Sequence, residues 1–199
     1  MKNPLLIATG NPGKVREIKA ILSSLEVGLI SAKDFSLCLQ VEETGESYLE
    51  NATIKAEAYL TASGLASLAD DSGLEVDCLD GAPGLFSARF SPKAGATDAD
   101  RRAILLKTLK GKPQPWTAHF HCTAVLAHPD GNTFSATGLC SGIIIPEERG
   151  GGGFGYDPIF YLPEYHATMA ELPAQIKNQI SHRARALQAL LPHLEACLT

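Results

Sequence analysis

Residues 5–22 read LLIATGNPGKVREIKAIL, and this stretch decides the fold class. Its start, Leu5 to Ala8, predicts a short buried strand, and the apolar residues after Lys14 recur at the spacing of one helical face. Asn11 can cap that helix, and Pro12 suits its first position because the N–H that proline lacks would have no partner within the helix. The stretch therefore predicts a strand, a tight loop and a helix, in that order.

Further helices and strands follow along the chain. Ser47-Tyr48-Leu49-Glu50 has the form of a capping box and precedes a core stripe from Leu49 to Ser63, with Asn51 and Lys55 on a neighbouring face. The other predicted elements are a helix over Asp98 to Leu109, a last helix capped by Ser181 and kinked or shortened at Pro192, and strands over Leu65 to Ala69, Trp116 to His128, Thr133 to Ile145 and near Ile159 to Leu162. The predicted class is mixed α/β.

The composition is that of a globular protein. The chain has 199 residues, of which 45% are hydrophobic and 20% are charged. This hydrophobic fraction is large enough to form one substantial core and higher than that of disordered chains. We expect a single domain over residues 1–199, with two lobes. No stretch reaches about 18 consecutive apolar residues, and the first residues lack a signal-peptide layout. These features predict a soluble, cytoplasmic protein.

The net charge and the spacing of the cysteines exclude several classes of partner and site. The formal net charge is −5, and no run of Lys or Arg offers the broad basic face that a nucleic-acid backbone would need. We therefore expect no nucleic-acid and no membrane partner, and an anionic ligand must be met by locally gathered cations. The 5 cysteines are scattered and include no Cys-x-x-Cys pair, so we expect reduced thiols rather than a zinc site or a thiol-exchange centre.

The loop from Thr9 to Lys14 resembles a phosphate cradle, although it is not a Walker P-loop. Gly10 and Gly13 are separated by two residues, fewer than that motif has, and Val15 follows Lys14. The first N–H groups of a helix still point at an anion placed there, the helix dipole favours negative charge, and Lys14 can reach the same anion. The alternative is an ordinary strand-to-helix turn with an exposed lysine.

Two acidic segments can supply metal ligands. Ala69-Asp70-Asp71-Ser72-Gly73 should end a buried strand, and because neighbouring side chains of a strand leave on opposite faces, Asp70 and Asp71 should have different roles. A glutamate pair that ends at Glu43 comes just before the helix that carries Lys55. Mg²⁺ prefers one or two carboxylates with substrate phosphates completing its shell, a need that Glu43 and Asp71 would meet. The alternatives are a polar turn at the aspartates and a solvated loop at the glutamates.

Two later segments can hold the rest of a nucleotide. Residues 150–158 join four glycines to Phe154, which can stack on a planar base; a hairpin loop with a core phenylalanine is the alternative. His182 and Arg183 begin the predicted last helix, where cations oppose the helix dipole, so we expect a compensating anion or polar ligand there. A capped helix with a solvated first turn is the alternative. The other histidines lack a zinc-binding spacing and are interpreted as structural.

The motifs occur along the chain in this order: Ala8-Thr9-Gly10-Asn11-x-Gly13-Lys14, Glu43-x-Gly45, Glu50-Asn51-Ala52-x-x-Lys55-Ala56, Ala69-Asp70-Asp71-Ser72-Gly73-Leu74, Gly81-x-Pro83-Gly84-x-x-Ser87-Ala88-Arg89, Gly152-Gly153-Phe154-Gly155-Tyr156-Asp157-Pro158 and Ser181-His182-Arg183. Together they resemble the inosine/xanthosine triphosphate pyrophosphatases, the RdgB-type enzymes that remove deaminated, noncanonical purine nucleotides from the precursor pool. The resemblance runs from Leu6 to about Leu191. It implies an elongated, two-lobed α/β fold around a long, bent, mixed sheet with a cleft between the lobes, and a cytoplasmic homodimer.

The resemblance also implies a role for each matching position. It places Mg²⁺ on Glu43 and Asp71, makes Asp71 the general base and gives Asp70 a supporting role. The implied substrate residues are Thr9, Gly10, Asn11, Pro12, Gly13, Lys14 and Lys55 for the triphosphate, and Ser72, Phe154, Gly155, Tyr156, Asp157, Lys177, His182 and Arg183, the later ones mainly for the base and sugar. Members of the family often have Thr at position 151, so we expect Gly151 to alter loop flexibility rather than chemistry.

The implied reaction is attack of water on the α-phosphorus of ITP, dITP or XTP, which releases pyrophosphate. Lys14, Lys55 and Mg²⁺ would stabilise the growing negative charge. Hypoxanthine and xanthine carry an acceptor oxygen at C6, where adenine has a donor, so backbone N–H groups or the Arg183 guanidinium would favour them. Two alternatives stay open: a pyrophosphatase for other modified nucleotides, and a non-hydrolytic nucleotide-binding module, which would have no use for paired acids.

Overall fold

The computed structural model describes residues 4–37 and 39–198, which have a mixed α/β fold as predicted. Within these residues the sheet has seven strands, in the order β2-β1-β3-β4-β5-β6-β7. The strands are β1 (Leu5–Ile7), β2 (Leu29–Ser31), β3 (Ser67–Val76), β4 (Trp116–Ala127), β5 (Thr133–Ile144), β6 (Phe160–Leu162) and β7 (Ala167–Thr168). The α-helices are α1 (Pro12–Ile21), α2 (Tyr48–Ser63), α3 (Asp98–Leu109), α4 (Ala174–Ile180) and α5 (His182–Leu198). The sheet is mixed, because β1 pairs in parallel with β2 and β3 whereas β6 pairs antiparallel with β5 and β7.

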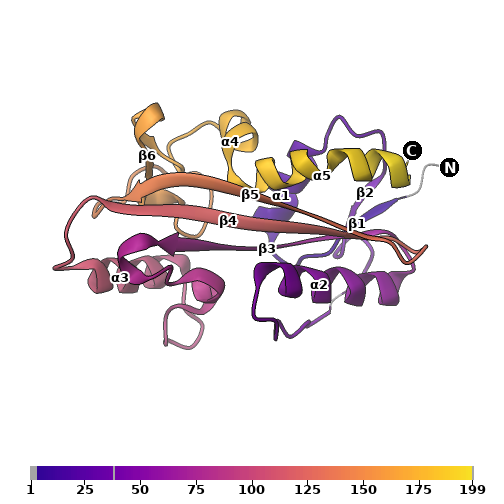
Figure 1. The fold of residues 1–199 in the computed structure, drawn as a ribbon, viewed down its shortest axis with the longest axis horizontal. Coiled ribbons are helices and arrows are strands. Elements are labelled where there is room, and N and C mark those ends of the chain that lie inside the picture. The colour runs from indigo at the N-terminus through magenta and orange to yellow at the C-terminus, as the bar shows by residue number, and fades with distance from the viewer. Residues whose placement is uncertain (1–3, 38, 199) are drawn as a thin grey trace. The chain divides into compact units, whose positions relative to one another are not determined.

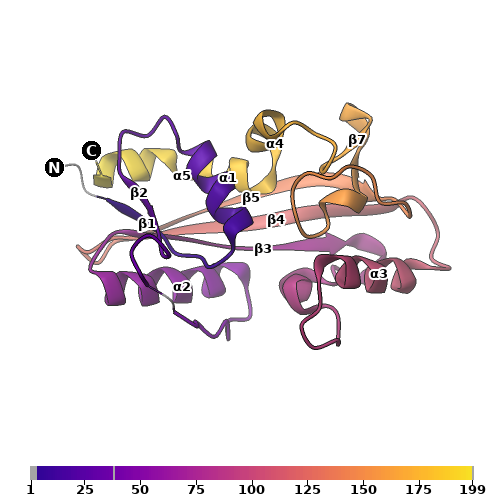
Figure 2. The ribbon, with the colours of Figure 1, turned by 180° about the vertical axis from the view of Figure 1, so that it is seen from behind.

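The chain divides into two compact units. Unit 1 comprises Met1–Asp71, Cys122–Gly138 and His182–Thr199, and unit 2 comprises Ser72–His121 and Leu139–Ser181. In unit 1, α1 and α5 cover one face of the strands and α2 covers the other (Figures 1 and 2). In unit 2, α3 lies on one side of the strands and α4 on the other (Figure 1). The single domain, the elongated shape and the cleft that the resemblance implied stay predictions.

Unit 1 has an apolar core on each face of its strands, and β1 shows why. Leu5 and Ile7 pack with residues of α1 and α5, whereas Leu6 and Ala8 pack with residues of α2. Successive side chains of a strand point to opposite faces, so an uninterrupted apolar run such as Leu5 to Ala8 suits a strand that is covered on both sides. The same covering encloses Asp70 and Asp71, polar side chains of β3, which are buried.

Several predicted elements are confirmed. The helix α1 begins at Pro12, and the Oδ1 of Asn11 accepts hydrogen bonds from the N–H groups of Gly13 (2.8 Å) and Lys14 (3.3 Å). The helix α3 has the predicted bounds and is capped by Thr97. The strands β4 and β5 each end one residue before the predicted end. The cap at Asn11 is a local signal, which is why the start of α1 could be predicted.

The predicted end of one strand was wrong, and the last helix is not shortened at its proline. The strand β3 does not end at the aspartates but continues to Val76, because cations from the packed helices pair with Asp70 and Asp71 and make them tolerable inside a buried strand. The helix α5 continues through Pro192 to Leu198, because Leu194 and Leu198 beyond the proline are buried in the core of unit 1. The elements β2, β7 and α4 were not predicted, since each is too short to show a clear period.

The buried face of α2 also differs from the prediction. Leu49 was placed in the core stripe but is 47% exposed, whereas Asn51 and Lys55 are buried. The capping box is only half formed: Ser47 Oγ accepts the N–H of Glu50 (3.2 Å), but the Glu50 carboxylate accepts the N–H of Glu46 (2.6 Å). The stripe is buried as predicted at Ala52, Ala56 and Tyr59. The buried face also includes Asn51 and Lys55, because both have polar partners inside unit 1.

Two further sequence predictions concern the thiols and the membrane. Cys78, Cys122, Cys140 and Cys197 are free thiols, as predicted, and Cys38 lies outside the described residues. None of the helices within residues 4–37 and 39–198 combines the length and the apolar character that crossing a bilayer requires.

Candidate functional site

The predicted site residues fall into two groups, one in each unit. Unit 1 holds Thr9, Gly10, Asn11, Pro12, Gly13, Lys14, Glu43, Lys55, Asp71, His182 and Arg183. Unit 2 holds Ser72, Phe154, Gly155, Tyr156, Asp157 and Lys177. The structure brings many members of each group into direct contact, while their roles in catalysis and binding stay predictions.

Lys55 joins the two predicted metal ligands. Its Nζ lies 2.8 Å from Glu43 Oε1 and 3.3 Å from Asp71 Oδ1. The side chains of Lys55 and Asp71 are 11% and 10% exposed, and that of Glu43 is 34% exposed. Burial lowers the pKa of Lys55, but the negative charges of Asp71, Asp70 and Glu43 outweigh it, so the net pKa lies above its ordinary value. Glu43 therefore does not lie in a merely solvated loop; it is one partner of a buried ammonium group.

Asn51 fixes the two carboxylates relative to α2. Its Nδ2 donates to Asp71 Oδ2 (3.3 Å), and its Oδ1 accepts the N–H of Gly45 (2.8 Å), which lies in the Glu43 loop. A Cβ at Gly45 would lie 2.6 Å from Glu50 Cβ, so only glycine permits this approach. Asn51 was not among the predicted site residues. Its position one helical turn before Lys55 could have indicated that both side chains face the same acids.

Asp70 is the centre of a second cluster, in which the side chains of Asp70 and Arg183 are almost completely buried. Its Oδ2 lies 3.0 Å from Lys14 Nζ and accepts hydrogen bonds from Arg183 Nε (3.1 Å) and Nη2 (2.9 Å). Arg183 Nη1 donates to Glu17. Burial raises the pKa of Asp70, but the charges of Arg183, Lys14 and Lys55 outweigh it and hold this pKa well below its usual range. Asp70 and Asp71 thus have separate partners, as the alternation of strand residues predicts.

The start of α5 has its counter-charge inside the protein. The exposed fraction is 5% for His182 and 1% for Arg183, so the alternative of a solvated first turn was wrong. The anions that compensate Arg183 are the carboxylates of Asp70 and Glu17, and no external anion is needed for this purpose. Glu17 was missed by the sequence analysis, although its place one helical turn after Lys14 indicates that the two side chains share a face of α1.

The predicted phosphate cradle has a mixed outcome. The side chain of Lys14 is 14% exposed and paired with Asp70, so the alternative of a turn with an exposed lysine was wrong. The N–H groups of Gly13 and Lys14 already donate to Asn11 Oδ1. An anion at the start of α1 would therefore share these N–H groups with Asn11 or displace its side chain. The binding of a triphosphate by Thr9 to Lys14 stays a prediction.

Asp157 organises the group in unit 2. Its Oδ2 accepts the N–H of Phe154 (2.8 Å) and is paired with Lys177 Nζ, which lies 5.1 Å from the centre of the Phe154 ring. A Cβ at Gly153 would lie 1.9 Å from the same Asp157 oxygen, and Gly153 has a φ of +70°, so this position requires glycine. The core residue of this loop is Tyr156, which is 4% exposed and donates to Ser87 O (2.9 Å). The alternative that placed Phe154 in the core was wrong, because Phe154 is only half-buried.

The remaining unit 2 predictions are placed as follows. Gly155 is held at both of its backbone groups: its N–H donates to Asp98 Oδ2 (2.8 Å) and its carbonyl accepts from Arg102 Nη1 (2.7 Å). Ser72 lies within β3 and is half-buried. The backbone of the Phe154 loop is thus fixed by side chains of α3.

The glycine run is anchored at its ends. A Cβ at Gly150 would lie 2.5 Å from the backbone of Ala170, and the N–H of Gly152 donates to Ala170 O (3.0 Å). A Cβ at Gly151, by contrast, would meet nothing within 4 Å. Position 151 therefore has room for a side chain.

Gly150→Ala and Gly151→Ala are expected to differ in stability. Gly150 has a φ of +81° and no room for a Cβ, so its replacement should lower the free energy of unfolding by about 1–3 kcal/mol. Gly151→Ala should be neutral or stabilising by up to about 1 kcal/mol, because it restricts the unfolded chain. Urea denaturation of both variants measures the difference. Equal effects would show that the Ala170 contact does not constrain this loop.

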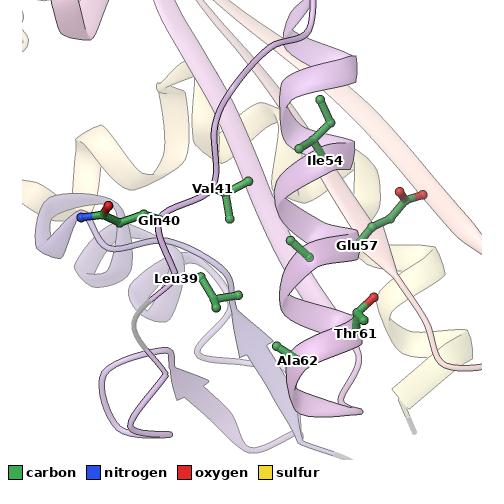
Figure 3. A pocket seen from close by; sticks show the side chains of 8 residues that line it. Leu39, Gln40, Val41, Ile54, Glu57, Thr61 and Ala62 are labelled. Atoms are coloured by element: carbon green, nitrogen blue, oxygen red, sulfur yellow. The ribbon is translucent and has the colours of Figure 1, made fainter.

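A pocket of about 530 Å³ lies elsewhere in unit 1, between residues 39–41 and α2 (Figure 3). Its walls are formed by Leu39, Gln40, Val41, Ile54, Glu57, Ala58, Thr61 and Ala62. None of the predicted site residues lines it, and its walls are mostly apolar. This pocket is therefore separate from the predicted site residues.

The acidic residues of unit 1 fit a magnesium ion that is shared with a substrate. Among residues 4–37 and 39–198, no three His, Cys, Asp or Glu side chains form a group that could hold a metal ion by themselves. Glu43 and Asp71 do converge on one cationic group, the Lys55 ammonium. Two carboxylate oxygens completed by phosphate oxygens and water are the usual shell of a nucleotide-bound Mg²⁺.

The chain is similar to known proteins over nearly its whole length. A model of the Ham1 family matches residues 5–193. A dITP/XTP pyrophosphatase of Geobacter sulfurreducens is 49% identical over 191 residues, covering 96% of this chain and 96% of that protein. A dITP/XTP pyrophosphatase of Thermus thermophilus is 47% identical over 188 residues, covering 94% of this chain and 89% of that protein. A solved HAM1 protein from Coxiella burnetii superposes with a TM-score of 0.86 at 41% identity, covering 98% of this chain and 99% of that chain.

Proposed function

Because this chain belongs to the Ham1 family, we propose that it hydrolyses the deaminated purine nucleoside triphosphates ITP, dITP and XTP to the monophosphate and pyrophosphate. Curated relatives named dITP/XTP pyrophosphatase match it over more than nine tenths of its length, which confirms the resemblance found in the sequence. The observation that carries the proposal is the convergence of Glu43 and Asp71 on Lys55, three side chains from separate segments. A non-hydrolytic binding module is not favoured, since the relatives are named as enzymes.

In the proposed reaction a water molecule attacks the α-phosphorus. The bond that breaks joins this phosphorus to the oxygen between the α- and β-phosphorus. Asp71 accepts the proton of the attacking water, as a general base within hydrogen-bond reach would. The electron pair of the broken bond stays on the departing pyrophosphate. Lys14 and Lys55 neutralise the charge that grows on the phosphate oxygens. The nucleoside monophosphate and pyrophosphate are the products.

Magnesium is part of this proposal. Glu43 and Asp71 would hold it, and when bound it would polarise the phosphate oxygens and the attacking water. Asn51 keeps Asp71 Oδ2 and the backbone of the Glu43 loop in place through its two hydrogen bonds. Asp70, which Lys14 and Arg183 neutralise, supports Asp71 from the next position of β3.

Base selection is proposed to depend on hydrogen-bond donors. The C6 oxygen of hypoxanthine or xanthine accepts a hydrogen bond, whereas the amine of adenine would leave a protein donor unpaired at a cost of about 1–3 kcal/mol. Backbone N–H groups and the Arg183 guanidinium are the proposed donors. Phe154 is proposed to stack on the plane of the base. The remaining contacts to base and sugar are assigned to Tyr156, Asp157, Lys177 and His182. Assembly as a homodimer and residence in the cytoplasm are proposed on the family resemblance.

Identification of the products from ITP tests the proposed function. Incubation of the purified chain with ITP and Mg²⁺ should yield IMP and pyrophosphate in equal amounts, and turnover of ATP should be slower by roughly ten- to a hundredfold per lost donor contact. Chromatography of the nucleotides with separate assays for pyrophosphate and orthophosphate measures both. Release of IDP and orthophosphate would place the attack on the γ-phosphorus and reject the proposal. A panel of modified pyrimidine triphosphates tests the remaining enzymatic alternative.

A further inference from the structure

The Lys55 ammonium and a divalent cation have the same protein ligands. Lys55 Nζ contacts Glu43 Oε1 and Asp71 Oδ1, and these two residues are the proposed metal ligands. The other oxygen of Asp71 accepts the Asn51 amide, so both oxygens of this carboxylate already have partners. A metal ion cannot use the same carboxylate oxygens while the ammonium remains beside them, because the two cations repel each other.

The charges of this cluster favour an exchange of cations. Glu43 and Asp71 together carry two negative charges, and Lys55 supplies one positive charge. A buried carboxylate without a partner is costly, so Lys55 stabilises the pair as long as no other cation is present. A divalent ion would balance both carboxylates and leave the ammonium available to an anion.

A nucleotide can drive this exchange because its phosphates offer Lys55 a new partner. The lysine ammonium is a compact charge on a flexible four-carbon stem and is a common phosphate ligand. Lys14, in the other cluster, can leave Asp70 more easily, since Arg183 still pairs with that carboxylate. Of these two lysines, Lys55 is the one that pairs with two acids, so its release removes the cation from both.

We infer that Lys55 holds the position of the metal between Glu43 and Asp71 in the nucleotide-free protein, and that the phosphates of the substrate draw it away and thereby open the metal site. This inference rests on the proposed function and deepens it. Metal and nucleotide then bind with positive coupling, and the protein without nucleotide has little affinity for the metal alone. Such coupling is reciprocal: each ligand raises the affinity for the other by the same factor.

The test is a titration of the full-length protein with Mn²⁺, in which electron paramagnetic resonance measures the concentration of the free ion. Lys55→Met keeps the length of the side chain and removes the competing charge, so it should bind Mn²⁺ alone more tightly than the wild type by a factor of about 10 or more. Lys33→Met removes an exposed lysine of the same unit and should leave the Mn²⁺ affinity unchanged. Equal or weaker Mn²⁺ binding by a folded Lys55→Met variant would overturn the inference.

A second measurement needs no variant at this position. The wild type should bind Mn²⁺ more tightly by a similar factor of about 10 or more when an ITP analogue with a methylene bridge between the α- and β-phosphorus is present. If the wild type binds Mn²⁺ equally well with and without the analogue, the inference fails even when Lys55→Met does not fold. Neither titration measures turnover. A protein that releases pyrophosphate from ITP but shows no coupling would keep the proposed function and lose only this inference.

Discussion

Asp71→Asn is expected to lower the rate of pyrophosphate release from ITP by about 10²–10⁴-fold, the usual contribution of a general base. The substitution keeps the size of the side chain, and its amide oxygen can still accept a hydrogen bond from Lys55. It removes the negative charge and with it the ability to take a proton from water. Steady-state assays of pyrophosphate release measure kcat. Calorimetric titration with ITP in the absence of a divalent ion measures nucleotide binding, which should change little.

Asp77→Asn is the matched control for that experiment. Asp77 has the same side chain and is exposed at the start of the 3₁₀ helix Asp77–Leu79, and its Oδ1 lies 3.9 Å from His119 Nδ1. Its replacement should leave kcat unchanged. If Asp71→Asn turned over ITP at the rate of this control, Asp71 would be neither the base nor an essential ligand.

Arg183→Ala is expected to lower the free energy of unfolding by about 3–5 kcal/mol, the cost of removing one partner from a buried ion pair. The guanidinium is 1% exposed and donates to Asp70 and Glu17, so its loss leaves two carboxylates with fewer cations inside unit 1. Urea denaturation followed by circular dichroism measures the change. Lys14 would remain the ion-pair partner of Asp70 and limit the loss.

Two other variants calibrate this result. Arg185→Ala changes the same residue type two positions further along α5, at an exposed site, and should alter stability by no more than about 0.5 kcal/mol. Glu17→Gln leaves Arg183 paired with Asp70 and should have an intermediate effect. If Arg183→Ala cost no more than Arg185→Ala, the buried cluster around Asp70 would not stabilise the fold.

Much of the architecture could be predicted because its signals are local. Asn11 and Pro12 mark the start of α1 within two residues, and α3 has the bounds predicted for it from the sequence. Runs of residues with strand propensity predict the long strands β4 and β5. The buried strand β1 needs only a short apolar run between polar neighbours.

The wrong predictions share one cause, which is contact between residues that are far apart in the sequence. The hydrophobic stripe of α2 predicted a buried Leu49, and the acidic run predicted the end of β3. Both were wrong because Asn51, Lys55 and the two aspartates satisfy one another inside unit 1. A polar side chain becomes a core residue only when its partners arrive from elsewhere, and periodicity does not contain that information.

The sequence by itself determined the mixed α/β class, the family, and which residue types form the motifs. Only the tertiary structure decided how the charged residues pair. Asp70 is bound by an arginine 113 positions away, and that arginine reaches a glutamate 166 positions away. The physical reason is that a buried charge is stable only beside a partner of opposite charge. Which partner lies close enough depends on which helices pack on the sheet, and residues far apart in the sequence can be neighbours there.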